Sequence, residues 1–271
     1  MDPDSRRLVD DLVRLSTRRA FIVGAGAGVA ALAAARLHAA PAAAVDAPCR
    51  VVPEETAGPF PADGSAPRFG PPGGGASRGR AVPNALALSG IVRRDIRPSL
   101  GGTGKVAGGV PLTLTLRVED AGRQCAAAAG LAVYVWHCDR EGRYSLYEQP
   151  VDRESYLRGV QWADAQGEVV FDTVFPGCYP GRMPHIHFEV YGPGPGGLGR
   201  RLATSQLAFP VAGCEEVYRS AAGYADSAAH LRRMSFDSDM VFSDGVSQQM
   251  AALRGSPAAG YGAMLRIAVT A

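Results

Sequence analysis

The chain has 271 residues, of which 46% are hydrophobic and 20% charged, a balance that is ordinary for a globular protein and argues against general disorder. Its 28 basic and 26 acidic residues give a net charge of +2, which argues against nucleic acid as the main partner because phosphate binding requires a strong basic excess. The 34 glycines and 20 prolines predict many turns and few long helices.

The N-terminal segment has the pattern of an export signal. Arg18 and Arg19 stand beside an apolar run from Ala20 to Ala35, with Phe21 two places after the pair. Small residues from Ala40 onward suit a signal peptidase. The arginine pair is similar to a twin-arginine signal, and this resemblance implies export of an already folded protein, often with its metal bound. A basic helix end formed by chance is the alternative.

We therefore expect two parts, an export signal over residues 1–44 and a mature domain over residues 45–271. The apolar run has 16 residues, fewer than the roughly 20 that a membrane-spanning helix needs, although an uncleaved signal kept as an anchor stays open. The mature domain is expected outside the cytoplasm, either extracellular, periplasmic or anchored on the outer side of the membrane.

A segment dense in proline, glycine and serine, from Pro61 to Pro83, is predicted to be a loop. After it the chain is a series of short apolar runs broken by turn residues. The predicted strands are Leu86–Arg93, Val110–Val118, Ala132–Cys138, Glu168–Val174, His185–Tyr191, Ala203–Phe209 and Met264–Val269. Two short helices are expected, over Glu215–Ala222 and Val246–Leu253.

The alternation inside these runs indicates half-buried strands. Leu112, Leu114 and Leu116 share one face, because successive side chains of a strand point to opposite sides. Seven or so short strands separated by turns are typical of an all-β protein. We predict an antiparallel β-sandwich with long loops and one or two short helices.

All the cysteines lie beyond the predicted signal, at Cys49, Cys125, Cys138, Cys178 and Cys214. Exported proteins can keep disulfides, and an odd number of cysteines allows at most two intrachain bridges with one thiol left over. The sequence does not pair them, and five buried thiols acting as small hydrophobic residues stay an alternative.

Two histidines, His185 and His187, stand one residue apart between apolar neighbours that predict a strand. Alternation places both imidazoles on one face and Ile186 on the other, so the pair can clamp a metal ion. A chance occurrence is the alternative. Glu189 continues the same face and would complete a ferrous two-histidine, one-carboxylate site, but nothing else in the sequence supports that site. The His-Glu-x-x-His pattern of zinc helices is absent.

Two tyrosines, Tyr144 and Tyr179, stand in turn-rich segments upstream of the histidine pair. The segments, in their order along the chain, resemble those of the intradiol ring-cleavage dioxygenases, the family of protocatechuate and catechol dioxygenases. They are Glu55–Phe60, Trp136–Tyr144, Pro176–Pro180, Arg182–His187 and Thr204–Gln206. The resemblance spans about residues 49–210, and several linked motifs in order are far more specific than any one of them.

The resemblance implies one Fe(III) per chain. The ligands that it implies are Tyr144, Tyr179, His185 and His187. Arg182 stands where the family keeps its catalytic arginine, and Gly58, Pro59 and Gln206 stand where the family lines its substrate pocket. These residue types suit the ion, because Fe(III) is hard and favours anionic oxygen. A tyrosine titrates near about 10, but a trivalent ion removes the phenol proton of a bound tyrosine.

The reaction implied by this resemblance opens a catechol ring between its two hydroxyl-bearing carbons. The catechol binds as a dianion, Tyr179 leaves the iron and takes one substrate proton, and O2 attacks the ring. Arg182 stabilises the developing negative charge. Both oxygen atoms enter a muconate-type diacid, without an external reductant or an organic cofactor. The expected partners are a small aromatic diol and O2; nucleic acid is not expected, and membrane contact only through a retained signal.

Several neighbouring residues have plainer interpretations. Tyr147, three residues after Tyr144, is the alternative tyrosine ligand. His137 and His230 are expected to be structural or solvated, and Cys178 to be a packing residue or a disulfide partner rather than a ligand. Two other functions also stay open: a non-catalytic exported β-sandwich that binds carbohydrate, aromatic polymer or a partner protein, and a zinc hydrolase that uses the histidine pair with a third histidine or acid.

The chain departs from the family in the link between Tyr179 and Arg182, and it also lacks the long helical N-terminal dimerisation region of the catechol-specific enzymes. Only Pro180 and Gly181 intervene, whereas the well-known enzymes have a longer loop that walls the substrate pocket. We expect a more open pocket, and the sequence does not identify the catechol or the oligomeric state. Arg182 as an ordinary surface charge is the alternative to its catalytic role, and Arg93–Asp95 is predicted to be a solvated turn that could flank the pocket mouth.

Overall fold

The computed structural model describes residues 49–65, 82–101 and 103–271. The predicted export signal, residues 1–44, and most of the predicted loop Pro61–Pro83 lie outside the described residues. The chain divides into two compact units, residues 1–47 and 48–271, and the described residues belong to the second. Within these described ranges, no helix has the length and apolar character needed to cross a membrane.

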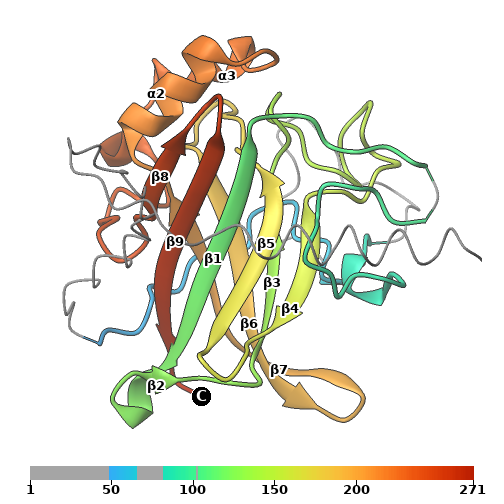
Figure 1. The fold of residues 1–271 in the computed structure, drawn as a ribbon, viewed down its shortest axis with the longest axis vertical. Coiled ribbons are helices and arrows are strands. Elements are labelled where there is room, and N and C mark those ends of the chain that lie inside the picture. Colours follow the sequence, from blue (N-terminus) through green and yellow to red (C-terminus); the bar gives the residue numbers. More distant parts are fainter. Residues whose placement is uncertain (1–48, 66–81, 102) are drawn as a thin grey trace, which may run out of the picture. The chain divides into compact units, whose positions relative to one another are not determined.

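Two β-sheets form the second unit (Figure 1). The first sheet has the order β2-β1-β9-β8, with β5 paired to the other edge of β1. Its strands are β1 (Pro111–Asp120), β2 (Ala126–Ala127), β5 (Glu168–Val174), β8 (Ala252–Ser256) and β9 (Gly260–Val269). The second sheet has the order β4-β3-β6-β7 and is antiparallel throughout. Its strands are β3 (Ala132–Trp136), β4 (Arg158–Trp162), β6 (His185–Gly194) and β7 (Gly197–Ala208).

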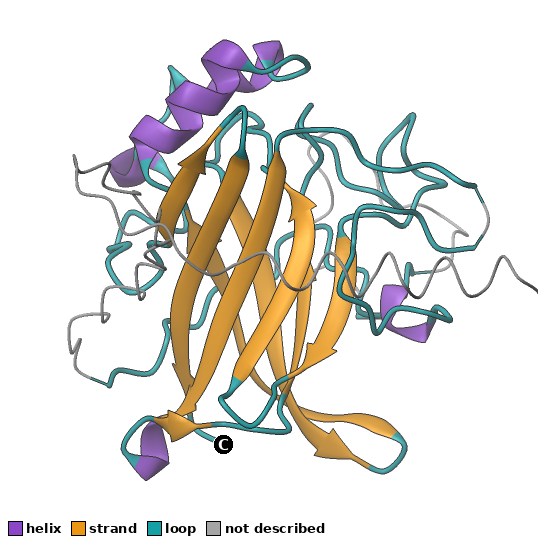
Figure 2. Ribbon diagram, viewed as in Figure 1, coloured by secondary structure: helices purple, strands orange, loops and turns teal. Residues whose placement is uncertain are grey.

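Among the described residues, two α-helices pack against each other at one end of the sheets (Figure 2). They are α2 (Val211–Ser220) and α3 (Ala225–Leu231), and three short 3-10 helices are η1 (Ala85–Ala87), η2 (Ala121–Arg123) and η3 (Phe236–Ser238). Strand β9 runs parallel to β1, which is possible because a long stretch of chain separates the two strands, whereas a tight hairpin would make them antiparallel. The predicted β-sandwich is therefore confirmed, with one parallel pair that an all-antiparallel sheet would lack.

The main core lies between the sheets and follows from strand alternation. Leu112, Leu114 and Leu116 of β1 are all buried on one face, as the alternation predicts. They belong to the same apolar cluster as Ile186 and Phe188 of β6. Burial of this apolar surface is the dominant favourable contribution to folding, roughly 25 cal/mol for each Å².

The outer face of the second sheet is buried as well. All five residues of β3 are buried, although only alternate ones can face the first sheet. Tyr134 and Trp136 belong to a separate cluster with Phe60 and Tyr144. Phe60 comes from the first described segment, residues 49–65, which is called the N-terminal segment from here on, and Tyr144 comes from the loop after β3. Loops, rather than a third layer, therefore cover this face and shield it from water.

Most predicted strands are confirmed, with shifts of a few residues at their ends. The predicted strand Leu86–Arg93 is wrong, because this segment contains most of η1 and only one isolated bridge, at Val92. The predicted helix Val246–Leu253 is also wrong, since that segment is a turn leading into β8. The other predicted helix, Glu215–Ala222, overlaps α2. Strands β2, β4 and β8 and helix α3 were not predicted.

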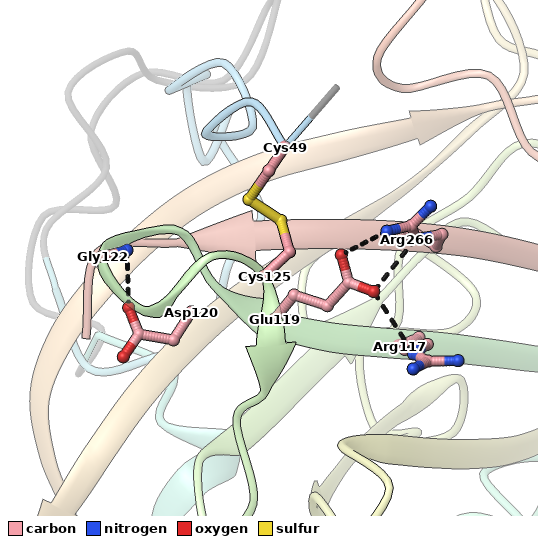
Figure 3. Close-up of a disulfide and its surroundings, with 7 residues drawn as sticks. All are labelled: Cys49, Arg117, Glu119, Asp120, Gly122, Cys125 and Arg266. Carbon is pink, nitrogen blue, oxygen red and sulfur yellow. Dashed lines mark hydrogen bonds and ion pairs between the residues drawn. A yellow bond between two sulfur atoms is a disulfide. The ribbon is translucent and has the colours of Figure 1, made fainter. Parts of the chain in front are cut away.

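One disulfide joins Cys49 to Cys125, 76 residues apart, at the end of the first sheet (Figure 3). Cys138, Cys178 and Cys214 are free and buried, so one bridge forms of the two that the count allowed. Beside the bridge, the buried carboxylate of Glu119 pairs with Arg117 and Arg266 (Figure 3).

Candidate metal centre

The start of β6 places the histidine pair on the outer face of the second sheet. His185 and His187 are both about 2% exposed, and the intervening Ile186 points into the core between the sheets. In the register of three neighbouring strands, His187 lies between Trp136 of β3 and Gln206 of β7. The Trp136 indole stacks on the His187 ring, with centroids 4.8 Å apart and planes 5° apart. The shared face expected from alternation is therefore present.

The loop after β3 carries Tyr144 and is shaped by its own sequence. The Asp139 carboxylate accepts hydrogen bonds from the backbone N–H groups of Glu141 and Arg143, both at 3.0 Å. Gly142 takes the left-handed conformation, φ +85°, which glycine adopts without steric cost. The Tyr144 N–H then donates to Glu148 at 2.6 Å. In the pattern Asp-x-x-Gly-x-Tyr, the aspartate and the glycine thus form a turn that positions the tyrosine side chain in the interior.

The loop with Tyr179 packs directly against this turn. A Cβ on Gly177 would lie 2.6 Å from the Asp139 carbonyl oxygen, so only glycine allows the two backbones to come this close. Ser227 of α3 ties the loops together, because its hydroxyl donates to the Arg140 carbonyl and accepts from the Cys178 N–H, both at 2.9 Å. The two tyrosine loops are therefore held as one unit beside the histidine strand.

The side chains named by the resemblance converge on Nε2 of His185. This atom lies 3.3 Å from the Tyr144 hydroxyl, 3.2 Å from the Tyr179 hydroxyl and 3.0 Å from Nε2 of His187. Nδ1 of His185 lies 2.6 Å from the Met183 carbonyl, which can only accept, so the ring proton sits on Nδ1. Nε2 therefore presents its lone pair to the other three groups.

The electrostatics of these groups suit a cation. Burial, followed by the neighbouring Arg182 charge, lowers the pKa of His185 well below its usual range, and burial followed by His185 does the same for the pKa of His187. Both imidazoles are therefore neutral, as metal ligands must be. Burial raises the pKa of Tyr179 to about 12 and, with Tyr179 beside it, raises the pKa of Tyr144 well above its usual value. A trivalent cation would offset this cost of ionising the phenols.

The donor set therefore fits Fe(III), with two neutral nitrogens and two phenol oxygens. It does not fit the alternatives. In the part of the chain that the structure describes, no group of three or more His, Cys, Asp or Glu side chains is placed to hold a metal ion. The Glu189 carboxylate, which a ferrous site would need, instead accepts hydrogen bonds from Tyr191 and Arg201.

Arg182 is buried beside the histidine pair and is not a surface charge. Its Nε lies 3.0 Å from the Asp239 carboxylate, and its Nη2 donates to Gln206 Oε1 at 2.6 Å. The Gln206 amide in turn donates to the Thr56 carbonyl at 2.8 Å. Gln206, expected to line the substrate pocket, is fully buried and holds the arginine.

The N-terminal segment closes over the same place. Gly58 has φ +68°, and a Cβ there would lie 3.4 Å from Cε1 of His187. The half-buried Pro59 follows it, and the Phe60 ring stacks on Tyr144 with centroids 4.7 Å apart. Of the residues expected to line the substrate pocket, Gly58 thus lies beside a histidine of the site, close enough for an added methyl group to touch it.

The residues with plainer interpretations lie elsewhere. The Tyr147 hydroxyl accepts a hydrogen bond from the Ala62 N–H at 2.8 Å, so Tyr147 does not replace Tyr144. His137 contacts the Cys138 carbonyl and the Thr173 hydroxyl, and His230 contacts the Cys178 carbonyl, which are structural roles.

The predicted solvated turn Arg93–Asp95 is wrong for Arg93. Its guanidinium is directed inward and donates to main-chain carbonyls of Ile96, Pro98, Ser155 and Arg158. A planar group with five donors can satisfy several orphan carbonyls at once, which the sequence pattern did not reveal.

Sequence reasoning missed three supporting residues, Asp239, Ser227 and Glu148. Asp239 lies in the segment after η3 and is fully buried, yet it stands among other polar residues in the sequence. No periodic pattern marks such a residue, because its importance comes from where the chain folds back.

Comparisons with known proteins show what the chain is similar to in sequence and in fold. A protein-family model described as Dioxygenase matches residues 100–217. Over 113 residues the chain is 34% identical to the protocatechuate 3,4-dioxygenase beta chain of Burkholderia cepacia. This match covers 38% of this chain and 46% of that relative, so it spans about half of the relative's length. The fold is similar to that of an intradiol ring-cleavage dioxygenase from Tetranychus urticae, with a TM-score of 0.60, 24% identity, and coverage of 82% of this chain and 95% of the other. The chain therefore resembles the intradiol ring-cleavage dioxygenases, in sequence over part of its length and in fold over most of it.

Proposed function

We propose that the chain is a non-haem Fe(III) dioxygenase that inserts both atoms of O2 into a catechol-type diol. The ring would open between the two hydroxyl-bearing carbons and give a muconate-type diacid. The observation that carries this proposal is the convergence of Tyr144, Tyr179, His185 and His187, with phenol and imidazole atoms 3.0 to 3.3 Å from one nitrogen. When bound, the iron would act as a Lewis acid that withdraws electron density from the diol.

The chain's own residues supply the rest of the chemistry. Tyr179 is the more exposed of the two tyrosine residues, and we assign to its Oη the role of accepting a proton from a substrate hydroxyl. Arg182 supplies a permanent positive charge next to His185, with Nη1 3.5 Å from Nε2. Trp136 and Phe60 pack behind His187 and Tyr144 and exclude water from that side of the site.

The substrate enters, in this proposal, beside the short link between Tyr179 and Arg182. Pro180 and Gly181 are exposed, and Tyr179 is partly exposed, whereas Tyr144 is 1% exposed. An entrance walled by two small residues leaves room for catechols with substituents on the ring. We therefore expect activity on several catechols rather than on one.

Metal content, colour and oxygen uptake test the proposal together. The purified protein should contain about one iron per chain and show the broad visible tyrosinate-to-iron band of a burgundy protein. It should consume O2 with catechol, hydroxyquinol or protocatechuate. Tyr144→Phe should weaken the band and the uptake, whereas the matched control Tyr147→Phe should change neither. A wild-type protein that stays colourless after ferric reconstitution, or that contains zinc, would contradict the proposal.

We also propose that residues 1–44 direct export, so that the domain works outside the cytoplasm. The support is the disulfide between Cys49 and Cys125, since disulfides persist in oxidising compartments. Cell fractionation with N-terminal sequencing of the mature protein tests this. A start near residue 45 outside the cytoplasm is expected, and a cytoplasmic protein with an intact N-terminus would contradict it.

A further inference from the structure

We infer that Asp239 is a positioning residue that aims a single nitrogen of Arg182, Nη1, at the bound diol. The inference rests on the proposed function. Asp239 is fully buried in the segment after η3, about 55 residues beyond the histidine pair in sequence. Its role is to hold a charge in place rather than to react.

The Asp239 carboxylate joins two segments of the chain. Both of its oxygens lie within 3.1 Å of Arg182 Nε, and the same carboxylate accepts from the Met183 N–H at 2.6 Å. On its own segment it accepts from the N–H groups of Val241, at 2.8 Å, and Phe242, at 3.2 Å. The backbone donors fix the carboxylate, and the carboxylate then fixes the guanidinium.

The hydrogen bonds of Arg182 leave one nitrogen directed at the site. Nε faces Asp239, and Nη2 is bound by Gln206. The Phe242 ring lies 5.6 Å from the guanidinium carbon and covers it. Because the guanidinium is planar, fixing Nε and Nη2 also fixes Nη1, which lies 3.5 Å from Nε2 of His185. Nη1 is thus the donor placed where charge develops on the substrate.

Because the Arg182 guanidinium is buried, it needs the negative charge of Asp239 to stay in place. The Arg182 and Asp239 side chains are 9% and 0% exposed, and a buried cation whose counter-charge is removed is strongly destabilised. Without the carboxylate, the charged guanidinium would be more stable if it turned toward solvent, which it could reach next to the exposed Gly181. Its Nη1 would then leave the site, even with the four proposed ligands in place.

Asp239→Asn separates this role from simple structural support. The asparagine keeps one acceptor oxygen but presents an NH2 group, so it cannot serve both the backbone N–H groups and Arg182 Nε. We expect kcat for catechol to fall about 10- to 100-fold, the cost of misplacing a catalytic group by about 1 Å, with KM changed less than about threefold. Iron content and the tyrosinate-to-iron band should stay as in the wild type.

A double-mutant cycle with Arg182→Ala tests whether Asp239 acts through Arg182. The double variant should be no slower than Arg182→Ala alone, since there is no guanidinium left to position. Independent losses that multiply would overturn the inference, as would wild-type kcat in Asp239→Asn. The control is Glu119→Gln, which breaks a buried ion pair at the far end of the first sheet and should leave kcat unchanged.

A crystal structure of Asp239→Asn gives a readout that does not depend on turnover. We expect the Arg182 guanidinium to leave Gln206 while the four proposed ligands stay in place. A guanidinium in its wild-type position would overturn the inference. If iron-loaded wild-type protein consumes no O2 with any catechol, the proposed function fails, and the crystal structure still decides whether Asp239 holds Arg182.

Discussion

The two faces of the second sheet are both shielded from water, but the side chains of β6 are apolar on one face and polar on the other. The face toward the first sheet carries Ile186 and Phe188, which belong to the apolar cluster between the sheets. The outer face carries His187 and Gln206, each 2% exposed or less, under the N-terminal segment and the loop after β3. The difference lies in what covers each face.

A sheet can cover another sheet only with side chains, whereas loops also bring backbone groups that have no ladder partner. On the outer face these groups satisfy buried polar side chains, as when the Thr56 carbonyl accepts from Gln206 and the Met183 carbonyl accepts from His185. A polar site that is shielded from water is therefore possible on the loop-covered face, while apolar burial on the other face stabilises the fold.

Adjacent substitutions in β6 give the largest contrast between the faces. His187→Ala should lower turnover at least about 1,000-fold, because losing one member of a catalytic set costs this much or more in other enzymes. Ile186→Val, one residue earlier on the opposite face, should cost only about 0.5 to 1.5 kcal/mol of unfolding free energy and keep full iron content. Iron analysis, oxygen uptake and urea unfolding measure these effects. A drop in iron content in Ile186→Val would contradict the separation of the faces.

The inter-sheet face is probed by Leu114→Ala. Leu114 is fully buried, so the lost contacts and the remaining cavity should lower the unfolding free energy by about 2 to 5 kcal/mol. The visible iron band and the KM for catechol should be unchanged below the melting temperature. A variant with an altered band but normal stability would show that the two faces are coupled.

His137 predicts how stability changes with pH. Its side chain is buried between the sheets against Thr173, and burial lowers its pKa from 6.5 to about 4, with the Arg158 charge adding to this and the hydrogen bond to Cys138 opposing it. The unfolded chain binds a proton below about pH 6.5, and the folded chain does so only near pH 4. Stability is therefore present above pH 6.5 and is lost as the pH falls.

The effect of His137 should reach roughly 2 to 3 kcal/mol by pH 4.5. Urea unfolding of the wild type and of His137→Gln at pH 7 and pH 4.5 measures it. The wild type should lose more stability than the variant over this range, and the contribution of iron release should cancel in the difference. Equal losses would show that His137 is not held neutral.

The sequence predicts what depends on local pattern. The alternation in β1 and the turn spacing around Tyr144 are local, and the structure contains both. The strand predicted at Leu86–Arg93 failed because its apolar residues pack in the outer-face cluster without a ladder partner over most of their length. Apolar composition alone cannot tell a strand from a covering loop.

The same distinction, between local sequence pattern and contacts distant in sequence, applies to the residues of the candidate site. The motifs named the four proposed ligands and Arg182, and the structure brings these side chains together around His185. Asp239 and Ser227 were missed, because each acts through contacts to residues about 50 or more positions away in sequence. The role of Gln206 also differs from expectation, since its side chain holds Arg182 and Thr56 rather than standing free at the site.

The smallest expected effect comes from a methyl group added at Gly58, compared with one added at Gly130. Gly58 and Gly130 both have left-handed backbones, with φ of +68° and +79°, so alanine at either should cost about 1 kcal/mol of stability. At Gly130 the methyl would meet nothing within 4 Å, whereas at Gly58 it would lie 3.4 Å from His187. Gly58→Ala should therefore raise KM for catechol several-fold, whereas Gly130→Ala should not. Steady-state kinetics with thermal unfolding decide this, and equal KM values in the two variants would mean that the N-terminal segment covers the histidine without bordering the substrate.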